Sequence, residues 1–289
     1  MKSFMERSDW LLLIIPGIIW GASFYLIAEA LDAFDPALIT PLRILFGGAV
    51  LIAIPAARKP ILRVDYPLIA LLALLWMVIP LSLFPFAEQR VSTSVTGMLN
   101  GATPLFVATV ASIVVRHLPT RRQLLGLGIG FVGVLCIAIP TAGKGGSSAV
   151  GVGMVLLAIV CYGFALNIAV PLQQRNGALP VVLRAQIIAL IVTAPFGIAS
   201  VPRSTFAWHS FVAVLALGIL GTGLAYAAAV TLAGRVGSTR ASVTTYIIPV
   251  VSLGLGVALL DESVAVLSVV GCAFALAGAY VTNRTPRSD

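Results

Sequence analysis

The chain has 289 residues, of which 60% are hydrophobic and only 10% are charged. A soluble domain carries about 25% charged residues, so the mean hydropathy of +1.08 excludes an ordinary soluble protein. The formal net charge is +8, but the basic residues are scattered and form no patch with interleaved aromatic residues. This distribution argues against nucleic-acid binding and for a protein embedded in the lipid bilayer.

Ten apolar blocks follow one another along the chain, separated by charged or Pro/Gly-rich stretches. Each is close to the roughly 20 residues that a membrane-spanning helix needs, and is too long for a barrel strand. Lipid leaves no partner for unpaired backbone groups, so every block is predicted to be a helix. The predicted spans are Trp10 to Ala28, Ala37 to Ala57, Tyr66 to Phe86, Val91 to Val115, Leu124 to Ile139, Gly151 to Leu172, Leu179 to Val201, Phe211 to Thr231, Ala241 to Leu260 and Val264 to Val281.

The distribution of Lys and Arg predicts how these spans cross the membrane, because cytoplasmic connections carry an excess of basic residues. With the N-terminus in the cytoplasm, thirteen of the 18 Lys and Arg residues lie on the cytoplasmic side. Only Arg90, Lys144 and Arg203 lie outside. We therefore expect a multi-pass protein of the inner (plasma) membrane with both termini in the cytoplasm.

Sequence landmarks recur at an offset of about 141 to 145 residues, which indicates an internal duplication. Chance similarity within an apolar chain is the alternative. Five spans in each half is an odd number, so the second half enters the membrane in the opposite sense. We predict two five-helix repeats, residues 1–145 and 146–289, arranged as an inverted repeat around a central cavity. The matched landmarks are Trp20 and Tyr162, Arg43 and Arg184, Phe84 and Tyr226, Pro104 and Pro249, Gly126 and Gly271, and Gly133 and Gly278.

Four parts of the sequence carry a resemblance to a known family: Trp20 to Phe24, Arg43, Ser92 to Pro104 and Gly126 to Gly133. In these residues the chain resembles the ten-helix exporters of the drug/metabolite transporter superfamily, in its EamA-type branch, and within that branch it is similar to YddG-like aromatic amino-acid exporters. The resemblance implies a secondary transporter with a substrate site between its two halves, near the middle of the bilayer. The sequence departs from the family at Tyr162, which replaces a second Trp, and at His117, where the family often has an acidic residue.

Polar side chains recur at three- and four-residue spacing in the fourth and ninth spans, so in each span they share one helical face. One interpretation is hydrogen bonding between helices. We favour a second, in which Asn100 and Thr245, related by the repeat, help to line a water-filled cavity. Pro104 and Pro249 are expected to kink these spans and are candidate gates. The polar positions are Thr96, Asn100 and Thr103 in the fourth span and Ser238, Ser242, Thr245 and Ser252 in the ninth.

Aromatic residues occur inside the spans rather than at their ends, where an aromatic belt would place them. Ordinary core packing is the alternative for each residue taken alone. If they converge, they form an apolar pocket that accepts flat or apolar side chains by stacking. The candidate substrate-binding aromatic residues are Trp20, Phe24, Trp76, Phe84, Tyr162, Tyr226 and Tyr246.

Arg43 and Arg184 are the two basic residues within spans, where a centred charge costs about 2.5 to 3.5 kcal/mol. Each lies near one end of its span, so snorkelling or bonding to helix-end carbonyl groups is one interpretation. The other is a pair of charges that attract a carboxylate or lock a gate, one on each side of the cavity.

No Asp or Glu lies in the central part of a span, so the carboxylate proton relay of an antiporter is missing. We therefore expect facilitated diffusion, with proton coupling through Glu29 or Glu88 as the alternative. The sequence predicts no enzyme activity, no cofactor and no metal site. The motif from Gly128 to Gly133 fits GxGxxG, but it lies inside a span and follows no strand, which argues against a dinucleotide site.

The sequence thus predicts a carrier that exports small amphipathic metabolites, most of all aromatic or apolar amino acids, by alternating access. Its partners would be a small-molecule substrate and the lipid bilayer. A multidrug or nucleobase exporter of the same fold is one alternative. It would need a similar pocket, but unlike an amino-acid exporter it would need no feature that binds the two charges of a zwitterion. A membrane enzyme or a structural membrane protein is the other. The enzyme would need clustered His, Asp or Glu, and a structural protein gives no reason for matched polar faces.

Overall fold

The computed structural model describes residues 7–115, 119–143, 145–236 and 242–283, and these residues form helices joined by short connections. The α-helices are α1 (Arg7–Leu31), α2 (Pro36–Ala53), α3 (Tyr66–Ala73), α4 (Ile79–Glu88), α5 (Thr93–Asn100), α6 (Thr103–Val115), α7 (Arg121–Ala142), α8 (Gly146–Asn176), α9 (Ala178–Ser200), α10 (Trp208–Ala216), α11 (Ala225–Val236), α13 (Ile248–Leu259) and α14 (Val266–Asn283). Shorter segments are η1 (Pro55–Arg58), η2 (Arg63–Asp65), η3 (Leu74–Val78), η4 (Val201–Arg203), η5 (Leu217–Leu224) and η6 (Ser242–Tyr246).

Eight helical stretches are long and apolar enough to cross a membrane. Two shorter apolar helices, Thr244–Leu259 and Val266–Thr282, coincide with the last two predicted spans. The chain is therefore an all-helical, multi-pass membrane protein. The eight long stretches are Ser8–Leu31, Pro36–Ala53, Arg63–Glu88, Thr93–Ile113, Arg121–Ala142, Gly146–Asn176, Ala178–Arg203 and Trp208–Leu232.

Two of the long helices contain a π-helical segment, η3 between α3 and α4, and η5 between α10 and α11. A π segment interrupts the regular i to i−4 hydrogen bonds and frees carbonyl groups for other partners. In η5 the hydroxyl of Thr222 donates to the carbonyl of Leu217 over 3.3 Å. The two segments begin at Leu74 and Leu217, which occupy the same place in the two predicted halves.

The fourth and ninth spans each contain a break, near the middle of the fourth and in the first half of the ninth. Helix α5 ends at Asn100 and α6 begins at Thr103, while η6 ends at Tyr246 and α13 begins at Ile248. The sequence predicted kinks at Pro104 and Pro249, but each proline is instead the second residue of the helix that follows the break. A proline is tolerated there because its missing N–H has no partner in the first turn of a helix.

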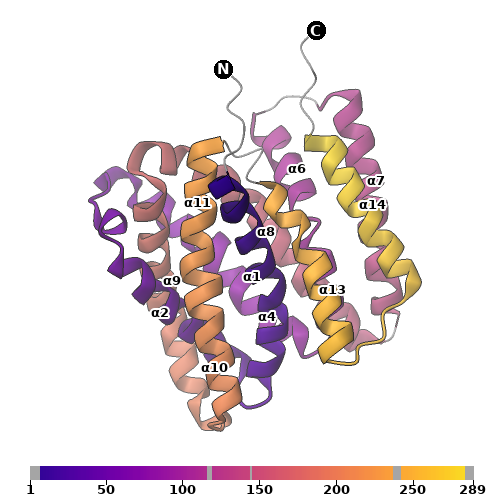
Figure 1. Cartoon of the computed structure of the whole chain (residues 1–289), viewed down its shortest axis with the longest axis horizontal. Helices are drawn as coiled ribbons and strands as arrows, with labels where there is room; N and C mark the ends of the chain where they lie inside the picture. The colour runs from indigo at the N-terminus through magenta and orange to yellow at the C-terminus, as the bar shows by residue number, and fades with distance from the viewer. Residues whose placement is uncertain (1–6, 116–118, 144, 237–241, 284–289) are drawn as a thin grey trace.

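Helices α7 and α14 lie side by side at one edge of the bundle (Figure 1). Their contact is made by glycines. A methyl group on Gly126 would lie 2.8 Å from the carbonyl oxygen of Gly278, and one on Gly271 would lie 2.7 Å from the carbonyl oxygen of Gly133. The two backbones therefore touch, as expected of a small-residue ridge in a membrane.

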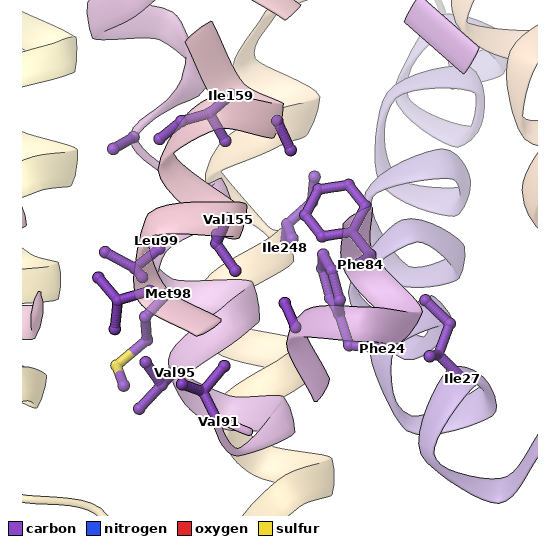
Figure 2. Packing of buried hydrophobic residues seen from close by; sticks show 14 of the residues in the cluster. Phe24, Ile27, Phe84, Val91, Val95, Met98, Leu99, Val155, Ile159 and Ile248 are labelled. Atoms are coloured by element: carbon purple, nitrogen blue, oxygen red, sulfur yellow. The ribbon is translucent and has the colours of Figure 1, made fainter. Parts of the chain in front are cut away.

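Three pairs of helices that correspond in the predicted halves pack on each other: α2 on α9, α5 on α13 and α7 on α14. The beginning of α1 and the end of α14 lie at the same end of the bundle (Figure 1). A cluster of buried apolar side chains from α1, α4, α5, α8 and α13 fills the middle (Figure 2). This core surrounds the aromatic residues singled out in the sequence.

Candidate functional site

Tyr226 lies at the centre of a first group of aromatic rings. Its ring centroid is 5.6 Å from that of Trp20 and 5.1 Å from that of Trp76. These spacings are typical of favourable aromatic contacts. Trp76 and Tyr226 are buried and Trp20 is half-buried. Three predicted site residues from α1, η3 and α11 are therefore in contact.

Phe84 joins a second group. Its ring centroid lies 5.4 Å from that of Phe24 and 6.1 Å from that of Tyr162. Figure 2 shows the rings of Phe24 and Phe84 side by side within the core. Trp20 and Tyr162 are half-buried and pack against both of the large apolar clusters of the bundle. The structure thus brings six of the seven predicted aromatic residues into one interior region.

Tyr246, the seventh predicted aromatic residue, is half-buried and packs against the cluster in Figure 2. Thr245 beside it is also half-buried, and both lie in η6 at the break of the ninth span. Ser252 is buried, and its hydroxyl donates to the carbonyl of Pro249 over 3.2 Å. Ser238 and the side chain of Ser242 lie outside the described residues.

The polar face of the fourth span is buried. Thr96 has no exposed surface, and its hydroxyl donates to the carbonyl of Ser92 over 3.0 Å. The hydroxyl of Thr103 donates to the carbonyl of Asn100 over 2.7 Å, across the break between α5 and α6. Asn100 is 8% exposed. Both hydrogen bonds stay within the fourth span, so they are not the bonds between helices that the packing interpretation expects. A substrate role for Thr96 and Asn100 also stays a prediction.

The π segment η5 is a meeting point for side chains from three other helices. The Trp20 indole donates to the carbonyl of Gly221 over 3.0 Å, and the Gln186 amide donates to the carbonyl of Thr222 over 2.6 Å. Sequence analysis did not single out Gln186 or Thr222. The signals were present, since Gln186 is a polar residue inside an apolar span and Thr222 stands between two glycines.

Arg43 is the third residue that binds this segment. It is 4% exposed, and its Nε donates to the hydroxyl of Thr222 over 3.1 Å. Tyr162, Tyr226 and Glu88 lie within electrostatic range of its guanidinium group. Arg43 therefore does not snorkel to a surface but lies inside the bundle beside the aromatic groups.

Arg184 has a different environment. It is half-buried, and its Nη1 donates to the carbonyl of Ala57 over 2.6 Å while its Nη2 reaches the carbonyl of Arg58 at 3.3 Å. These carbonyls belong to η1, just beyond the end of α2. Arg184 therefore binds carbonyl groups near a helix end, which is the first of the two interpretations given for the arginines within spans.

A contact joins the two predicted halves at the end of the bundle predicted to be outer. The Glu262 carboxylate accepts hydrogen bonds from the backbone N–H groups of Thr93, at 2.7 Å, and Ser94, at 2.8 Å. These N–H groups begin α5, where a helix favours a negative charge. The Thr93 hydroxyl also donates to Glu88 over 3.3 Å. We call this contact the Glu262 latch.

The backbone around Glu262 is shaped for this contact. Asp261 has a φ of 50°, which a residue other than glycine seldom adopts. The Glu262 N–H donates to the carbonyl of Gly256 over 3.1 Å, and a methyl group on Gly256 would collide with Glu262 and Ser94. The unusual backbone of Asp261 and the absence of a side chain at Gly256 together hold the Glu262 carboxylate against α5.

A second contact fastens the same end of the bundle. Arg203 Nε lies 2.7 Å from Asp35 Oδ2, and the Ala37 N–H donates to Asp35 Oδ1 over 2.9 Å at the start of α2. The hydrogen bond from Arg203 lowers the pKa of Asp35, and the backbone bond from Ala37 adds to the lowering. A surface groove of about 380 Å³ is lined in part by Glu29 and Trp208, and none of its lining residues belongs to the two aromatic groups.

These features define a class of protein. Membrane-spanning helices, two of them broken and two containing π segments, enclose aromatic residues and a buried arginine, which is an architecture of secondary transporters. The EamA-like transporter family matches the chain twice, over residues 8–139 and again over residues 149–284. The chain belongs to the EamA-like transporter family.

Its relatives are also transporters by name. It is 25% identical to a protein of Salmonella typhimurium named a probable amino-acid metabolite efflux pump, over 96% of this chain and 95% of the relative. It is 26% identical to a protein of Streptantibioticus cattleyicolor named a probable terminal-alkyne amino-acid exporter, over 97% and 94%. One solved protein structure shares the fold with a TM-score of 0.65 at 19% identity, over 96% of each chain.

Proposed function

We propose that the protein exports small amphipathic metabolites, most of all aromatic or apolar amino acids, by alternating access across the inner membrane. The observation that carries the proposal is the convergence of six aromatic side chains and the buried Arg43 in the interior of the bundle. Rings accept an apolar side chain by stacking, and few polar groups are needed to orient it. The names of two relatives, a probable amino-acid metabolite efflux pump and a probable terminal-alkyne amino-acid exporter, support amino acids and their metabolites as the substrate class.

Alternating access in this proposal uses two halves, residues 1–145 and 146–289, as an inverted repeat around a central cavity. The same family matches each half separately. The π segments and the broken spans recur at corresponding places. The glycine contacts of α7 and α14 pair Gly126 with Gly278 and Gly133 with Gly271, as two antiparallel copies of one helix would.

The Glu262 latch is the outer gate in this proposal. It joins α5 of one half to the connection before α14 of the other, so the halves separate at this end only when the two N–H bonds break. Phe24, Phe84, Trp76 and Tyr226 are all buried. The two hydrogen bonds of the latch are therefore the observation that supports a gate at this end.

Flux into liposomes that contain the purified protein tests the function. Labelled phenylalanine, tryptophan and threonine are compared with adenine and a cationic dye. We expect phenylalanine and tryptophan flux, reduced at least tenfold by Trp20→Ala or Phe84→Ala. Phe196→Ala is the matched control, because Phe196 is 67% exposed on the membrane side of α9. Dye or adenine flux without amino-acid flux would favour a multidrug or nucleobase exporter instead.

The energy source is tested in the same liposomes. Since the central parts of the spans contain no carboxylate, we propose facilitated diffusion down the substrate gradient. Phenylalanine flux is expected to persist when the pH gradient is removed. Flux that requires the gradient would instead assign proton coupling to a carboxylate at the latch end, and Glu88→Gln would then abolish it.

The gate is tested by labelling. Ser94 has no exposed surface and its backbone is held by Glu262, so Ser94→Cys, in a chain whose native cysteines are replaced, should resist a membrane-impermeant maleimide. Adding Glu262→Gln weakens the latch and should speed the labelling at least tenfold. Asp32→Asn is the matched control, because Asp32 is exposed at the same end of the bundle. Equal labelling rates in all three proteins would contradict the gate.

A further inference from the structure

Arg43 is held from one side only. Its Nε donates to the Thr222 hydroxyl, and that hydroxyl in turn donates to the carbonyl of Leu217 within the π segment. The chain of two hydrogen bonds fixes the orientation of Thr222 and, through it, the plane of the guanidinium group. A rigid helix segment therefore presents the remaining face of this cation to the interior.

The other nitrogens of Arg43 are unused. A guanidinium group has five N–H donors, and one of them is bonded to Thr222. Among the described residues neither Nη1 nor Nη2 has a hydrogen-bond partner, and no ion pair includes Arg43. Glu88 lies within electrostatic range of Arg43 but accepts its hydrogen bond from Thr93 and forms no ion pair with the guanidinium group. A buried cation without an ion-pair partner is unfavourable, so the free N–H donors of Arg43 suit an anionic group of a ligand.

Neighbouring groups fit an anion as well. Tyr162 and Tyr226 lie within electrostatic range of Arg43, and within the described part of the chain their hydroxyls have no hydrogen-bond partner. A tyrosine hydroxyl can donate to a carboxylate, and a guanidinium group binds one in a fork with two parallel bonds. Both tyrosines belong to the aromatic groups, so the donors and the apolar surface are adjacent.

The geometry points to Arg43 as the residue that recognises a carboxylate, so we propose that the site takes carboxylates carrying an apolar or aromatic group and rejects the matching amines. This inference rests on the proposed function and deepens it by naming the charged group that the site reads. It separates the substrate from cationic drugs, which a purely aromatic pocket would accept. Thr222 is a positioning residue for Arg43.

Four compounds with one phenyl ring test the inference: phenylalanine, 3-phenylpropionate, phenylalaninamide and 2-phenylethylamine. The first two carry a carboxylate and the last two do not. We expect the first two to compete with labelled phenylalanine for uptake at least tenfold better than the last two. Equal competition by phenylalanine and phenylalaninamide would overturn the inference while leaving amino-acid transport intact.

Variants assign the preference to Arg43. Arg43→Gln should reduce the ratio between phenylalanine and phenylalaninamide to less than twofold. Arg43→Lys keeps the charge without the fork and should keep a preference of a few fold. Thr222→Val keeps Arg43 and should lower the ratio severalfold. Arg203→Gln is the matched control, because Arg203 is exposed at the end of the bundle. An unchanged ratio in Arg43→Gln would contradict the assignment.

Binding by the purified, detergent-solubilised full chain separates this inference from the transport proposal. Thermal unfolding is measured with each of the four compounds. A rise in midpoint with 3-phenylpropionate but not with 2-phenylethylamine supports carboxylate recognition even if no compound is transported. A rise with 2-phenylethylamine alone overturns it. If Arg43→Gln does not yield a monodisperse protein, Thr222→Val is compared with the wild type instead. In Thr222→Val, 3-phenylpropionate should raise the unfolding midpoint by less than it does in the wild type.

Discussion

Arg43 and Arg184 occupy corresponding positions in the two halves of the sequence, but the structure gives them opposite surroundings. Arg43 is 4% exposed and bonds a side chain of the π segment η5. Arg184 is half-buried and bonds two backbone carbonyls of η1. The same residue type therefore serves as an unpaired interior cation in one half and as a fastener between helices in the other.

The difference comes from what faces each arginine. Arg43 meets η5, whose freed backbone groups bind Trp20 and Gln186 as well. Arg184 meets the end of a helix, where the last carbonyl groups always lack helical partners. A duplicated sequence can thus specialise through the neighbours of a residue while the residue itself stays unchanged.

The largest expected effect is the separation of the two arginines by function. Arg43→Gln should reduce phenylalanine flux about 10- to 100-fold, because hydrogen bonds to charged groups contribute about 1.5 to 3 kcal/mol. Arg184→Gln should leave flux within about threefold, since a side chain bonded to backbone carbonyls has little to offer a substrate. Flux in liposomes, normalised to the amount of reconstituted protein, measures both. Equal losses would show that the two residues act as a pair.

A smaller loss is expected when the support of Arg43 is removed. Thr222→Val deletes the acceptor of the Nε bond and should lower phenylalanine flux by about tenfold, which corresponds to about 1.4 kcal/mol. Thr222→Ser restores the hydroxyl and should recover most of the flux. If valine and serine behave alike, the hydroxyl does not position Arg43.

Trp20 binds the same π segment, and two substitutions separate the contribution of its ring from that of its hydrogen bond. Trp20→Phe keeps a ring beside Tyr226 but loses the bond to the Gly221 carbonyl. A neutral hydrogen bond contributes about 1 kcal/mol, so we expect phenylalanine affinity to fall by about fivefold. Trp20→Ala loses the ring as well and should cost more. A competition assay with unlabelled phenylalanine gives both values, and identical affinities would assign the whole contribution to the ring.

For Arg184 the expected loss is in stability. Arg184→Gln removes the bonds to Ala57 and Arg58 and should lower the free energy of unfolding by about 1 kcal/mol. Thermal unfolding in detergent measures this loss. The ratio between phenylalanine and phenylalaninamide should remain that of the wild type, and a changed ratio would place Arg184 at the substrate site.

The smallest effect concerns an arginine at the surface. Because the hydrogen bond from Arg203 lowers the folded-state pKa of Asp35, the pair stabilises the protein at neutral pH. This contribution is lost as the pH falls below about 4, the usual pKa of an aspartate, through the lower folded-state pKa. Midpoints of thermal unfolding between pH 7 and pH 3 test this. Asp35→Asn should flatten the curve, and parallel curves would contradict the pair's contribution.

The sequence was sufficient for the all-helical membrane class because a bilayer constrains composition directly. Eight predicted apolar blocks coincide with helices long enough to cross a membrane, and the last two coincide with shorter apolar helices. Gly126 and Gly133, two landmarks of the predicted duplication, lie at the contact between α7 and α14. What sequence reasoning missed were breaks and partners: it predicted kinks at Pro104 and Pro249, where the chain instead ends one helix and starts another.

The aromatic residues show the same division. Their positions inside the spans identified them as candidates, yet only the packing of α1, α4, α8 and α11 brings Trp20, Tyr162 and Tyr226 into one region. Gln186 and Thr222 were overlooked because a single polar residue in an apolar span has many possible partners. A hydrogen bond between residues 36 positions apart becomes visible only once the helices are placed.

The sequence by itself determined the class of this protein, its helices and its family, because hydropathy and charge are properties of composition and order. Tertiary structure decided which of two equivalent arginines lies unpaired inside the bundle. It also decided that a glutamate after the ninth span binds the first backbone N–H groups of the fourth. In each case the structure sets the hydrogen-bond partner of a side chain. That partner depends on how the helices pack, and no local pattern in the chain specifies the packing.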